Sequence, residues 1–468
     1  MAGRRGNAVE VDVLVVGAGP TGLTAAIECL RHGLSVRVVD KHIERQEGSK
    51  ALVVHARTME AFHAMGVARE IRSRGIPFAA LNIFPDARPP AVRVPLGNDA
   101  GWGDTAFPYW LSTPQVDIER CLEARLHALG GRVDWAQGLL ELHQDDLGVD
   151  ARLATGTCRA RWLVGCDGGR STVRDQLGIQ MDRRRDGQLF VLADVLTRDG
   201  FPEDEGRVYR SRKGLTLIVP MPELQRFRLI AHLPGRDEPP LLDADFIENL
   251  VFERAGVSLG AHSVDWTSHV LLSHGQSQEV RRGRAFLAGD AAHLHSPVGG
   301  QGLNAGVQDS HDLIWKIAAA ERGVPNWLES YQVERTALTG RLVQAVTFAT
   351  LVMTLRRWIP WVVTARAARL TLSTRFVQRQ FARRMGMLEQ RLPPGPGVDD
   401  TSWAGRRLPN PLVGDERLHD RVDPLRPCVL DLPEGGVVVV RPDRVVVGRY
   451  ANRTAIPQRI RDLVPDLI

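Results

Sequence analysis

Residues 11–40 read VDVLVVGAGPTGLTAAIECLRHGLSVRVVD, and this stretch decides the fold. Its first part, residues 11–16, is a short run rich in valine, which is typical of a strand buried on both faces of a parallel sheet. A glycine-rich turn follows, then apolar residues at helical spacing that end at Gly33, then a second apolar run over residues 35–40. This order of strand, turn, helix and strand predicts a βαβ unit.

The turn of this unit has the spacing G-x-G-x-x-G, from Gly17 to Gly22. In such a turn the first glycine permits a tight bend, the second lets a pyrophosphate approach the backbone, and the third lets helix and strand pack closely. The free N–H groups at the start of the helix favour the negative charge of the phosphates. Asp40 ends the second strand, where a carboxylate accepts hydrogen bonds from a ribose. The unit therefore predicts dinucleotide binding, and the alternative is a glycine turn that serves packing alone.

Two further motifs each follow a predicted buried strand. The first is CDGGRSTVR at residues 166–174, and the second is GDAAHLHSPVGGQGLN at residues 289–304, where a helix begins near Leu303. Such a loop offers backbone N–H groups to an electron-rich ligand, and Asp290 can accept a hydrogen bond from a polyol hydroxyl. The two histidines of the second motif are interpreted as loop residues satisfied by the backbone, because no third ligand completes a metal geometry.

Composition excludes several classes of protein. The 468 residues are 43% hydrophobic and 25% charged, which is typical of a globular chain and not of a disordered one. A net charge of +5 is too weak to indicate nucleic-acid binding. The five scattered cysteines form no C-x-x-C pair or metal-ligand spacing, which suits a reducing cytoplasm. The longest late uncharged run, residues 342–355, is shorter than the roughly 20 residues that span a bilayer.

The rest of the chain divides into regions of different character. Residues 76–110 are rich in Pro and Gly and show little periodicity. Alternating apolar and polar residues over 182–280 predict an antiparallel sheet that is inserted between residues 10–181 and residues 281–391. The linker PPGPG then precedes residues 398–468, which contain a predicted hairpin. We expect an α/β fold built from these four regions.

Taken together and in this order, the three motifs resemble the class A flavoprotein aromatic hydroxylases, the family with the para-hydroxybenzoate hydroxylase fold. The resemblance is closest to bacterial polyketide and phenol-type hydroxylases and covers roughly residues 10–390. It implies a Rossmann-like FAD-binding domain, interrupted by a substrate domain at residues 182–280 and completed with a helical region by residues 281–391. It also implies that residues 398–468 are a shortened thioredoxin-like tail, which without C-x-x-C has no redox role.

The resemblance also implies which residues bind the cofactors. The pyrophosphate of FAD would lie on Gly17, Gly19, Pro20, Thr21 and Gly22, the adenosine ribose on Asp40, the phosphate and ribityl region on Gln115, the ribityl chain on Asp290, and the flavin ring on the loop with Pro297, Gly299, Gly302, Leu303 and Asn304. The motif shared by FAD and NADPH contributes Asp167, Gly168 and Arg174, and Lys50 stands where the family usually has arginine. Lysine keeps the charge at that position but lacks the bidentate fork.

The activity that the resemblance implies is aromatic hydroxylation in secondary metabolism. NADPH reduces FAD, dioxygen forms a flavin C4a-hydroperoxide, and one oxygen atom passes to a phenolic or polycyclic polyketide substrate. Two alternatives stay open: another oxidation on the same fold (epoxidation, ring opening or dehydrogenation), or a flavin-binding accessory protein without turnover. We expect a cytoplasmic monomer or homodimer without metal. No catalytic base is assigned, because His55, Tyr109, Tyr209 and His232 are each better explained as structural residues.

Residues 341–391 concentrate the positive charge of the chain. They contain ten arginines and one acid, Glu389, for a net charge of +9, so the remaining chain carries −4. One interpretation is a membrane-surface helix anchored by Trp358, Ile359 and Trp361. The other is a set of helices docked on the flavin domain with apolar sides inward and arginines in solvent, and it predicts no binding to anionic vesicles at about 0.15 M salt. The sequence favours the second, because the hydroxylases that it resembles are soluble.

Overall fold

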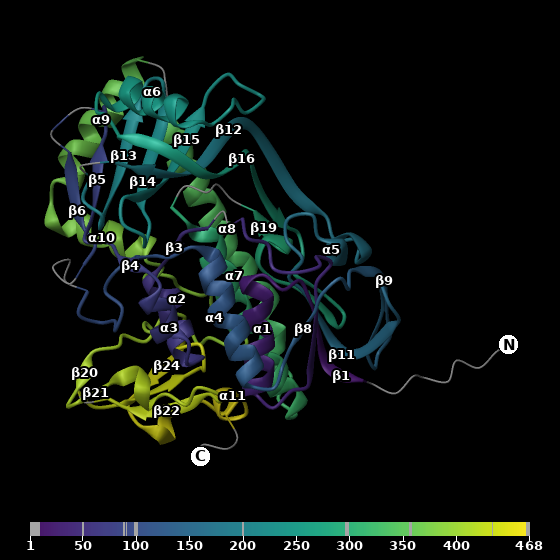
Figure 1. Ribbon diagram of the computed structural model, residues 1–468. Coiled ribbons are helices and arrows are strands. Elements are labelled where there is room, and N and C mark those ends of the chain that lie inside the picture. Colours follow the sequence, from purple (N-terminus) through teal and green to yellow (C-terminus); the bar gives the residue numbers. More distant parts are fainter. Residues whose placement is uncertain are drawn as a thin grey trace.

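A computed structural model describes residues 10–48, 51–87, 89, 91–97, 102–198, 201–294, 299–354, 358–432 and 434–464 (Figure 1). Within these ranges the side chains of residues 184–186 and 358–361 are not described. Two eight-stranded sheets form the body of the molecule, and the C-terminal residues lie together at the lower left of Figure 1. The predicted α/β fold with an inserted antiparallel sheet is confirmed.

The first sheet is built around β1 (Val11–Val16), which pairs in parallel with β2 (Val36–Val39) and β11 (Thr157–Gly165). On its far side β11 pairs in parallel with β18 (Ala285–Leu287). The carboxyl ends of β1, β11 and β18 therefore lie side by side, and each of the three motifs leaves the sheet from one of them. The sheet is completed by β8 (Val133–Asp134), β9 (Leu139–Gln144), β10 (Val149–Leu153) and β17 (Arg281–Arg282).

Three helices pack around this edge of the sheet. They are α1 (Pro20–Arg31), α4 (Gln115–Ala128) and α7 (Gln301–Glu321), and α1 contacts both of the others. The α1–α7 contact requires glycine, because a Cβ at Gly306 of α7 would lie 2.3 Å from the Thr21 hydroxyl of α1. This close approach holds the start of α1 against the third motif.

The second sheet has the order β19-β16-β12-β15-β14-β13-β5-β6 and is antiparallel except where β13 meets β5. Its strands are β19 (His293–Leu294), β16 (Ala261–Ser277), β12 (Met181–Thr197), β15 (Arg226–Leu233), β14 (Gly214–Pro220), β13 (Glu205–Ser211), β5 (Ala80–Phe84) and β6 (Val92–Pro95). Helix α6 (Ala244–Ala255) packs on one face through a cluster of buried apolar residues. Two strands come from the segment around residues 80–95, where sequence periodicity is weak, so this sheet extends beyond the region predicted to form it.

The helical region consists of α8 (Asn326–Thr354), α9 (Trp358–Leu372) and α10 (Arg375–Met385). Among the described helices, α8 is the one long and apolar enough to cross a membrane by length and composition, and 17% of its most apolar window is buried. The remaining short elements before the helical region are α2 (Ala56–Ala64), α3 (Ala68–Ser73), α5 (Thr172–Gln176), β3 (Val53–Val54), β4 (Ile76–Pro77) and β7 (Leu111–Ser112).

The C-terminal part has a three-stranded sheet of β22 (Cys428–Asp431), β23 (Val437–Val440) and β24 (Val446–Tyr450), the predicted hairpin being β23–β24. Before it lie β20 (Leu412–Val413) and β21 (Glu416–Arg417), and after it α11 (Gln458–Arg461). Valines of this sheet share an apolar cluster with Trp315 of α7 and Trp327 of α8. The C-terminal part, here called the tail, is therefore packed against α7 and α8.

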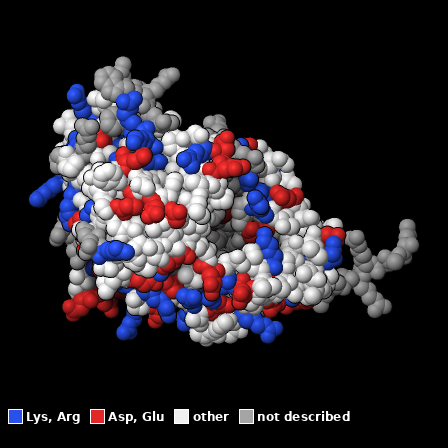
Figure 2. Space-filling model, turned by 45° about the horizontal axis from the view of Figure 1, so that its top comes forward, with Lys and Arg blue, Asp and Glu red and all other residues white. Residues whose placement is uncertain are grey.

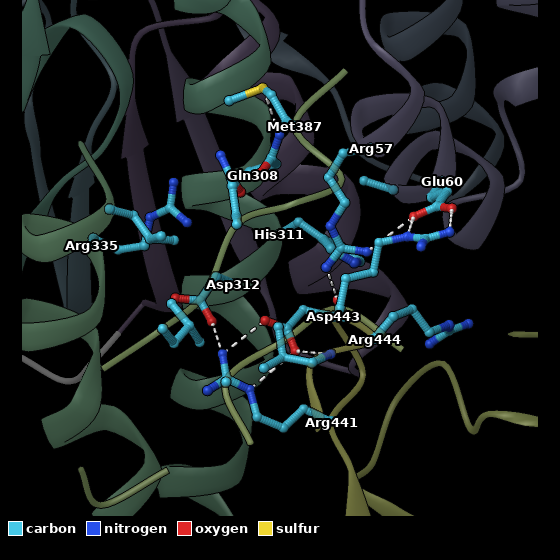
Figure 3. A pocket seen from close by; sticks show the side chains of 17 residues that line it. Arg57, Glu60, Gln308, His311, Asp312, Arg335, Met387, Arg441, Asp443 and Arg444 are labelled. Atoms are coloured by element: carbon cyan, nitrogen blue, oxygen red, sulfur yellow. Dashed lines mark hydrogen bonds and ion pairs between the residues drawn. The ribbon is translucent and has the colours of Figure 1, made fainter. Parts of the chain in front are cut away.

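A buried ionic network fastens this tail to α7 and α8 (Figure 3). The guanidinium of Arg441 donates to Asp443, at 2.7 Å to Asp312 of α7, and at 2.8 Å to Glu334 of α8, and it is fully buried. Lys316 donates to the same two carboxylates at 3.0 and 2.7 Å. The contacts of Arg441 with Asp312 and Glu334 thus pair opposite charges across the junction.

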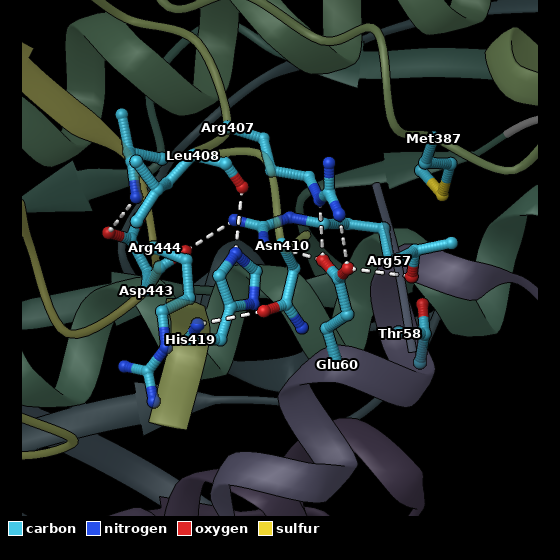
Figure 4. Close-up of polar contacts among 12 residues, drawn as sticks. Arg57, Thr58, Glu60, Met387, Arg407, Leu408, Asn410, His419, Asp443 and Arg444 are labelled. Atoms are coloured by element: carbon cyan, nitrogen blue, oxygen red, sulfur yellow. Dashed lines mark hydrogen bonds and ion pairs between the residues drawn. The ribbon is translucent and has the colours of Figure 1, made fainter. Parts of the chain in front are cut away.

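A second pair crosses the junction nearby (Figure 4). The Arg407 guanidinium donates two hydrogen bonds, of 2.7 and 2.6 Å, to the Glu60 carboxylate of α2, and the Thr105 hydroxyl also donates to Glu60. These opposite charges hold the pKa of Glu60 well below its usual range, although burial by itself would raise it. The tail is therefore bound to α2, α7 and α8 by paired buried ions.

Replacing Arg441 by alanine should lower the free energy of unfolding by about 3–5 kcal/mol, because Asp443 loses its buried ion-pair partner and Asp312 and Glu334 are left with Lys316 alone. Urea titration followed by circular dichroism measures this change. Arg453→Ala is the matched control, since Arg453 forms an exposed pair with Asp431 and should cost less than about 1 kcal/mol. Equal effects of the two substitutions would contradict the role given to the network.

Candidate active site

The three motifs enclose one end of a cavity of about 1310 Å³ that lies between the two sheets. Nine of the predicted cofactor-binding residues line it: Gly19, Pro20, Thr21, Gln115, Gly168, Asp290, Gly299, Gly302 and Leu303. The other end is lined by apolar residues of the second sheet and of α8 and α9. The cavity is therefore polar where the motifs meet and apolar beyond them.

The glycines of the first motif differ in conformation and in the space around them. Gly17 has a φ of +105°, and a Cβ there would lie 2.4 Å from the Cys166 carbonyl. A Cβ at Gly22 would lie 1.8 Å from the Gly17 carbonyl, so this glycine serves packing. At Gly19 a Cβ would meet no atom within 4 Å, which leaves the backbone open towards the cavity. A phosphate can approach the chain at this point.

Asp40 braces the same turn. Its carboxylate accepts hydrogen bonds from the Ala18 amide at 2.7 Å and from the His42 amide at 2.9 Å. It is not among the residues that line the cavity. Ribose binding by Asp40 stays a prediction, and the observed role is to hold the turn at the end of β2.

The second motif is fastened by its own side chains. The Asp167 carboxylate accepts from the Ser171 hydroxyl at 2.5 Å and from the Val173 amide at 3.1 Å. The buried Arg174 guanidinium donates to the Ala291 carbonyl at 3.0 Å and to Gly169 at 3.1 Å. These contacts tie the second motif to the third, so Asp167 and Arg174 position the loops while Gly168 faces the cavity.

The third motif depends on a buried carboxylate that sequence reasoning missed. Asp309 of α7 accepts from the Gly289 amide at 2.9 Å, from His293 Nε2 at 2.6 Å and from Arg335 Nε at 2.6 Å. Burial by itself would raise the pKa of Asp309, but Arg335, His293 and the Gly289 amide lower it to about 2. The interpretation of His293 as satisfied by the backbone is therefore wrong, because its partner is a carboxylate.

The loop at Gly299 and Gly300 is held from behind by His55 and Asn304. The amide of Asn304 donates to the Gly300 carbonyl at 2.6 Å and accepts from the His55 backbone at 2.8 Å. The His55 ring donates from Nε2 to the Gly299 carbonyl at 2.8 Å. Burial lowers the pKa of His55 to about 4, so the ring is neutral and unsuited to serve as a proton donor at neutral pH. Both residues position the loop, and neither lines the cavity.

The other residues that sequence reasoning weighed as bases lie elsewhere. Tyr209 is buried and stacks on Phe84, and His232 stacks on Phe190. Tyr109 packs under Arg72, and burial raises its pKa. Among the described residues none of these three side chains lines the cavity, which agrees with their interpretation as structural residues.

Some predicted residues cannot be placed, and some lining residues were not predicted. Lys50, Pro297 and His295 lie outside the described residues. Arg170 and Arg183 line the cavity near the second motif, and Arg183 donates to the Gly169 carbonyl at 2.8 Å. Arginine side chains form strong hydrogen bonds with phosphate, so two arginines in or near the second motif could have been predicted from the sequence to bind an anion. The described residues contain no group of His, Cys, Asp or Glu that could hold a metal ion.

The geometry fits FAD. A phosphate can lie at the open Gly19 backbone, at the start of α1. The first N–H groups of a helix have no partner within the helix and therefore favour an anion. Asp290 also lines the cavity and offers an acceptor for a hydroxylated chain. Gly299, Gly300 and Gly302 line it as well and can present backbone to a planar ring. The lining therefore offers groups suited to the phosphate, the ribityl chain and the flavin of FAD.

Comparison with known proteins agrees with this geometry. Residues 10–346 match the family model of the FAD-binding domain. The chain is 33% identical over 352 residues to 6-methylpretetramide 4-monooxygenase of Streptomyces rimosus, and the match spans 74% of this chain and 62% of that protein. The anhydrotetracycline hydroxylase OxyS from Streptomyces rimosus has 26% identity and a TM-score of 0.76, covering 97% of this chain and 99% of that one. The Diels-Alderase PyrE3 of pyrroindomycin biosynthesis has 27% identity and a TM-score of 0.77, with the same coverage.

The chain therefore belongs to the FAD-binding domain family. Within it, the relatives and structural neighbours place the chain with the FAD-dependent aromatic hydroxylases, which confirms the family that the three motifs resemble.

Asp290→Ala should weaken FAD binding, because a ribityl hydroxyl would lose a charged acceptor that contributes about 1.5–3 kcal/mol. This corresponds to a rise of about 10- to 100-fold in the dissociation constant, measured by flavin fluorescence on adding FAD to stripped protein. The control is Asp415→Ala, which removes an exposed carboxylate from the C-terminal part. Unchanged FAD affinity in Asp290→Ala would show that this carboxylate does not contact the cofactor.

Proposed function

We propose that this protein is an FAD-dependent monooxygenase that hydroxylates an aromatic substrate with NADPH and dioxygen. The observation that carries the proposal is the cavity between the two sheets, which joins the cofactor-binding edge to an apolar chamber without an intervening wall. Its volume of about 1310 Å³ exceeds the roughly 300–1,000 Å³ of most ligand sites, as a site for both cofactor and substrate requires.

The chamber suits a polycyclic aromatic substrate. Its walls include Leu192, Val208, Leu217 and Ile230 from the second sheet and Met353 from α8. Burial of a flat apolar ligand against such walls is favourable and excludes water. The relative that oxidises 6-methylpretetramide supports a polyketide substrate for this chain as well.

The arginine side chain of Arg210, on the second sheet, lines this chamber together with its apolar residues. Arg210 of β13 donates to the Val352 carbonyl at 3.2 Å and to the Thr364 hydroxyl at 2.7 Å, which fixes its guanidinium beside α8 and α9. We propose that it contacts a phenolic or carbonyl oxygen of the substrate. A cation at this point favours an ionised phenol, whose ring is more electron-rich and is therefore a better acceptor of oxygen.

When bound, FAD supplies the redox chemistry, taking hydride from NADPH and activating dioxygen. The protein orients the reactants: the Gly299–Gly300 corner is fixed by His55 and Asn304, and the apolar chamber excludes bulk water. Arg170 and Arg183 at the cavity are proposed to attract the phosphates of NADPH.

The organisation of the protein follows from the same proposal. We propose that residues 10–181 and 281–391 form the FAD-binding domain, that residues 182–280 with β5 and β6 form the substrate domain, and that residues 398–468 are a shortened thioredoxin-like tail. We propose a cytoplasmic enzyme, monomeric or homodimeric, that requires no metal.

Oxidation of NADPH should be slow in the absence of substrate and faster with a phenolic polycyclic compound, and the product should gain one oxygen atom from isotopically labelled dioxygen. Mass spectrometry of the product measures the label. The control is unlabelled dioxygen in labelled water, which should leave the product unlabelled. Incorporation of label from water, or a product whose mass is unchanged or decreased, would favour another reaction on this fold. The structural neighbour PyrE3, which is named as a Diels-Alderase, is a precedent for such a reaction.

A further inference from the structure

The outer side of α8, α9 and α10 carries a concentration of exposed apolar side chains. They are Phe348, Leu351, Val363, Leu370 and Phe376, each between 57% and 77% exposed. Of the fifteen large apolar side chains that are exposed among the described residues, these five fall within residues 348–376. Exposed apolar groups scattered singly need no explanation, but a concentration of them indicates a binding surface.

Helical spacing groups these residues on common faces. Phe348 and Leu351 are three residues apart on α8, and Val363 and Leu370 are seven apart on α9, so each pair lies on one face of its helix. Arg366 follows Val363 by three residues and shares its face. The exposed faces therefore combine apolar and basic side chains.

The charge of this surface has one sign. The sequence contains no Asp or Glu between Arg335 and Leu388. The exposed arginines that do not line the cavity are Arg341, Arg366, Arg375 and Arg379, and none forms an ion pair with a carboxylate of the described residues. Arg369 and Arg383, in contrast, pair with Asp86 and Asp104. Figure 2 shows Lys and Arg side chains at the left end of the molecule, where α9 and α10 lie in Figure 1, as well as elsewhere on the same face.

The inner side of the same helices is also apolar. Ala349, Val352 and Met353 of α8 and Ala368 and Leu372 of α9 line the proposed substrate chamber. These helices are thus apolar on two sides, unlike a helix that rests on a core and faces water. The interpretation with apolar sides inward accounts for the chamber wall but not for the exposed residues. Trp358, Ile359 and Trp361 lie outside the described side chains.

We propose that this surface of α8, α9 and α10 binds the headgroup region of an anionic lipid bilayer. The five apolar side chains would enter the interface, and the four exposed arginines would contact lipid phosphates. A second copy of the chain is a weaker occupant, because a symmetric dimer through this surface would oppose arginine to arginine. The proposal does not depend on the hydroxylation proposed above, and it places the substrate chamber one helix layer from the lipid.

Flotation of the full-length, FAD-loaded protein with vesicles tests the proposal. With phosphatidylglycerol vesicles at about 0.02 M salt the protein should float, and binding should weaken at about 0.15 M salt, where the Debye length falls to about 8 Å. Pure phosphatidylcholine vesicles should bind it at least about tenfold more weakly. No flotation with phosphatidylglycerol at the lower salt overturns the proposal.

Variants assign the binding to this surface. Phe348→Ser with Leu351→Ser should reduce vesicle binding at least about tenfold, and Arg375→Gln with Arg379→Gln by about 10- to 30-fold. The matched control is Leu147→Ser with Leu412→Ser, which removes two leucines of 74% and 64% exposure elsewhere and should leave binding unchanged. Retained FAD and an unchanged circular dichroism spectrum show that each variant folds. Equal loss in the control overturns the assignment, as does a dimer in solution that Phe348→Ser with Leu351→Ser dissociates.

Discussion

The carboxylate of Asp309 is the point on which the cofactor-binding edge depends. It is fully enclosed and accepts hydrogen bonds from the turn after β18, from His293 in the following loop and from Arg335 of α8. A buried carboxylate and a buried guanidinium are stable only while both are present. Because Asp290 directly follows the Gly289 amide that Asp309 holds, the position of this cavity-lining group is set by a charge pair outside the cavity.

Buried ion pairs also hold the C-terminal junction together. Arg441 and Arg407 of the tail pair with carboxylates on α2, α7 and α8. The tail contributes packing and buried charge at this junction. The tail is bound to α2 through Arg407 and Glu60. Since α2 begins directly after His55, whose ring donates to the Gly299 carbonyl, the tail also helps to position the loop at Gly299 and Gly300.

The parts of the fold that local pattern encodes could be predicted from the sequence. The βαβ unit and the roles of Gly17 and Gly22 follow from residue spacing, and the structure shows both roles, while phosphate binding at the open Gly19 backbone stays a prediction. Strands β5 and β6 could not be predicted, because their segment gains its regularity from pairing with β13. The role of Asp309 was also hidden, since its partners lie 16 to 26 positions away and only the fold brings them together.

The central claim is that the edge formed by β1, β11 and β18 is an FAD site. The most direct measurement is the flavin content of the purified protein, by absorbance and by chromatography of the supernatant after acid precipitation. We expect a yellow protein with one FAD per chain, all of it released by acid. Protein that stays colourless after incubation with FAD, or that binds no flavin in a titration, would contradict the account.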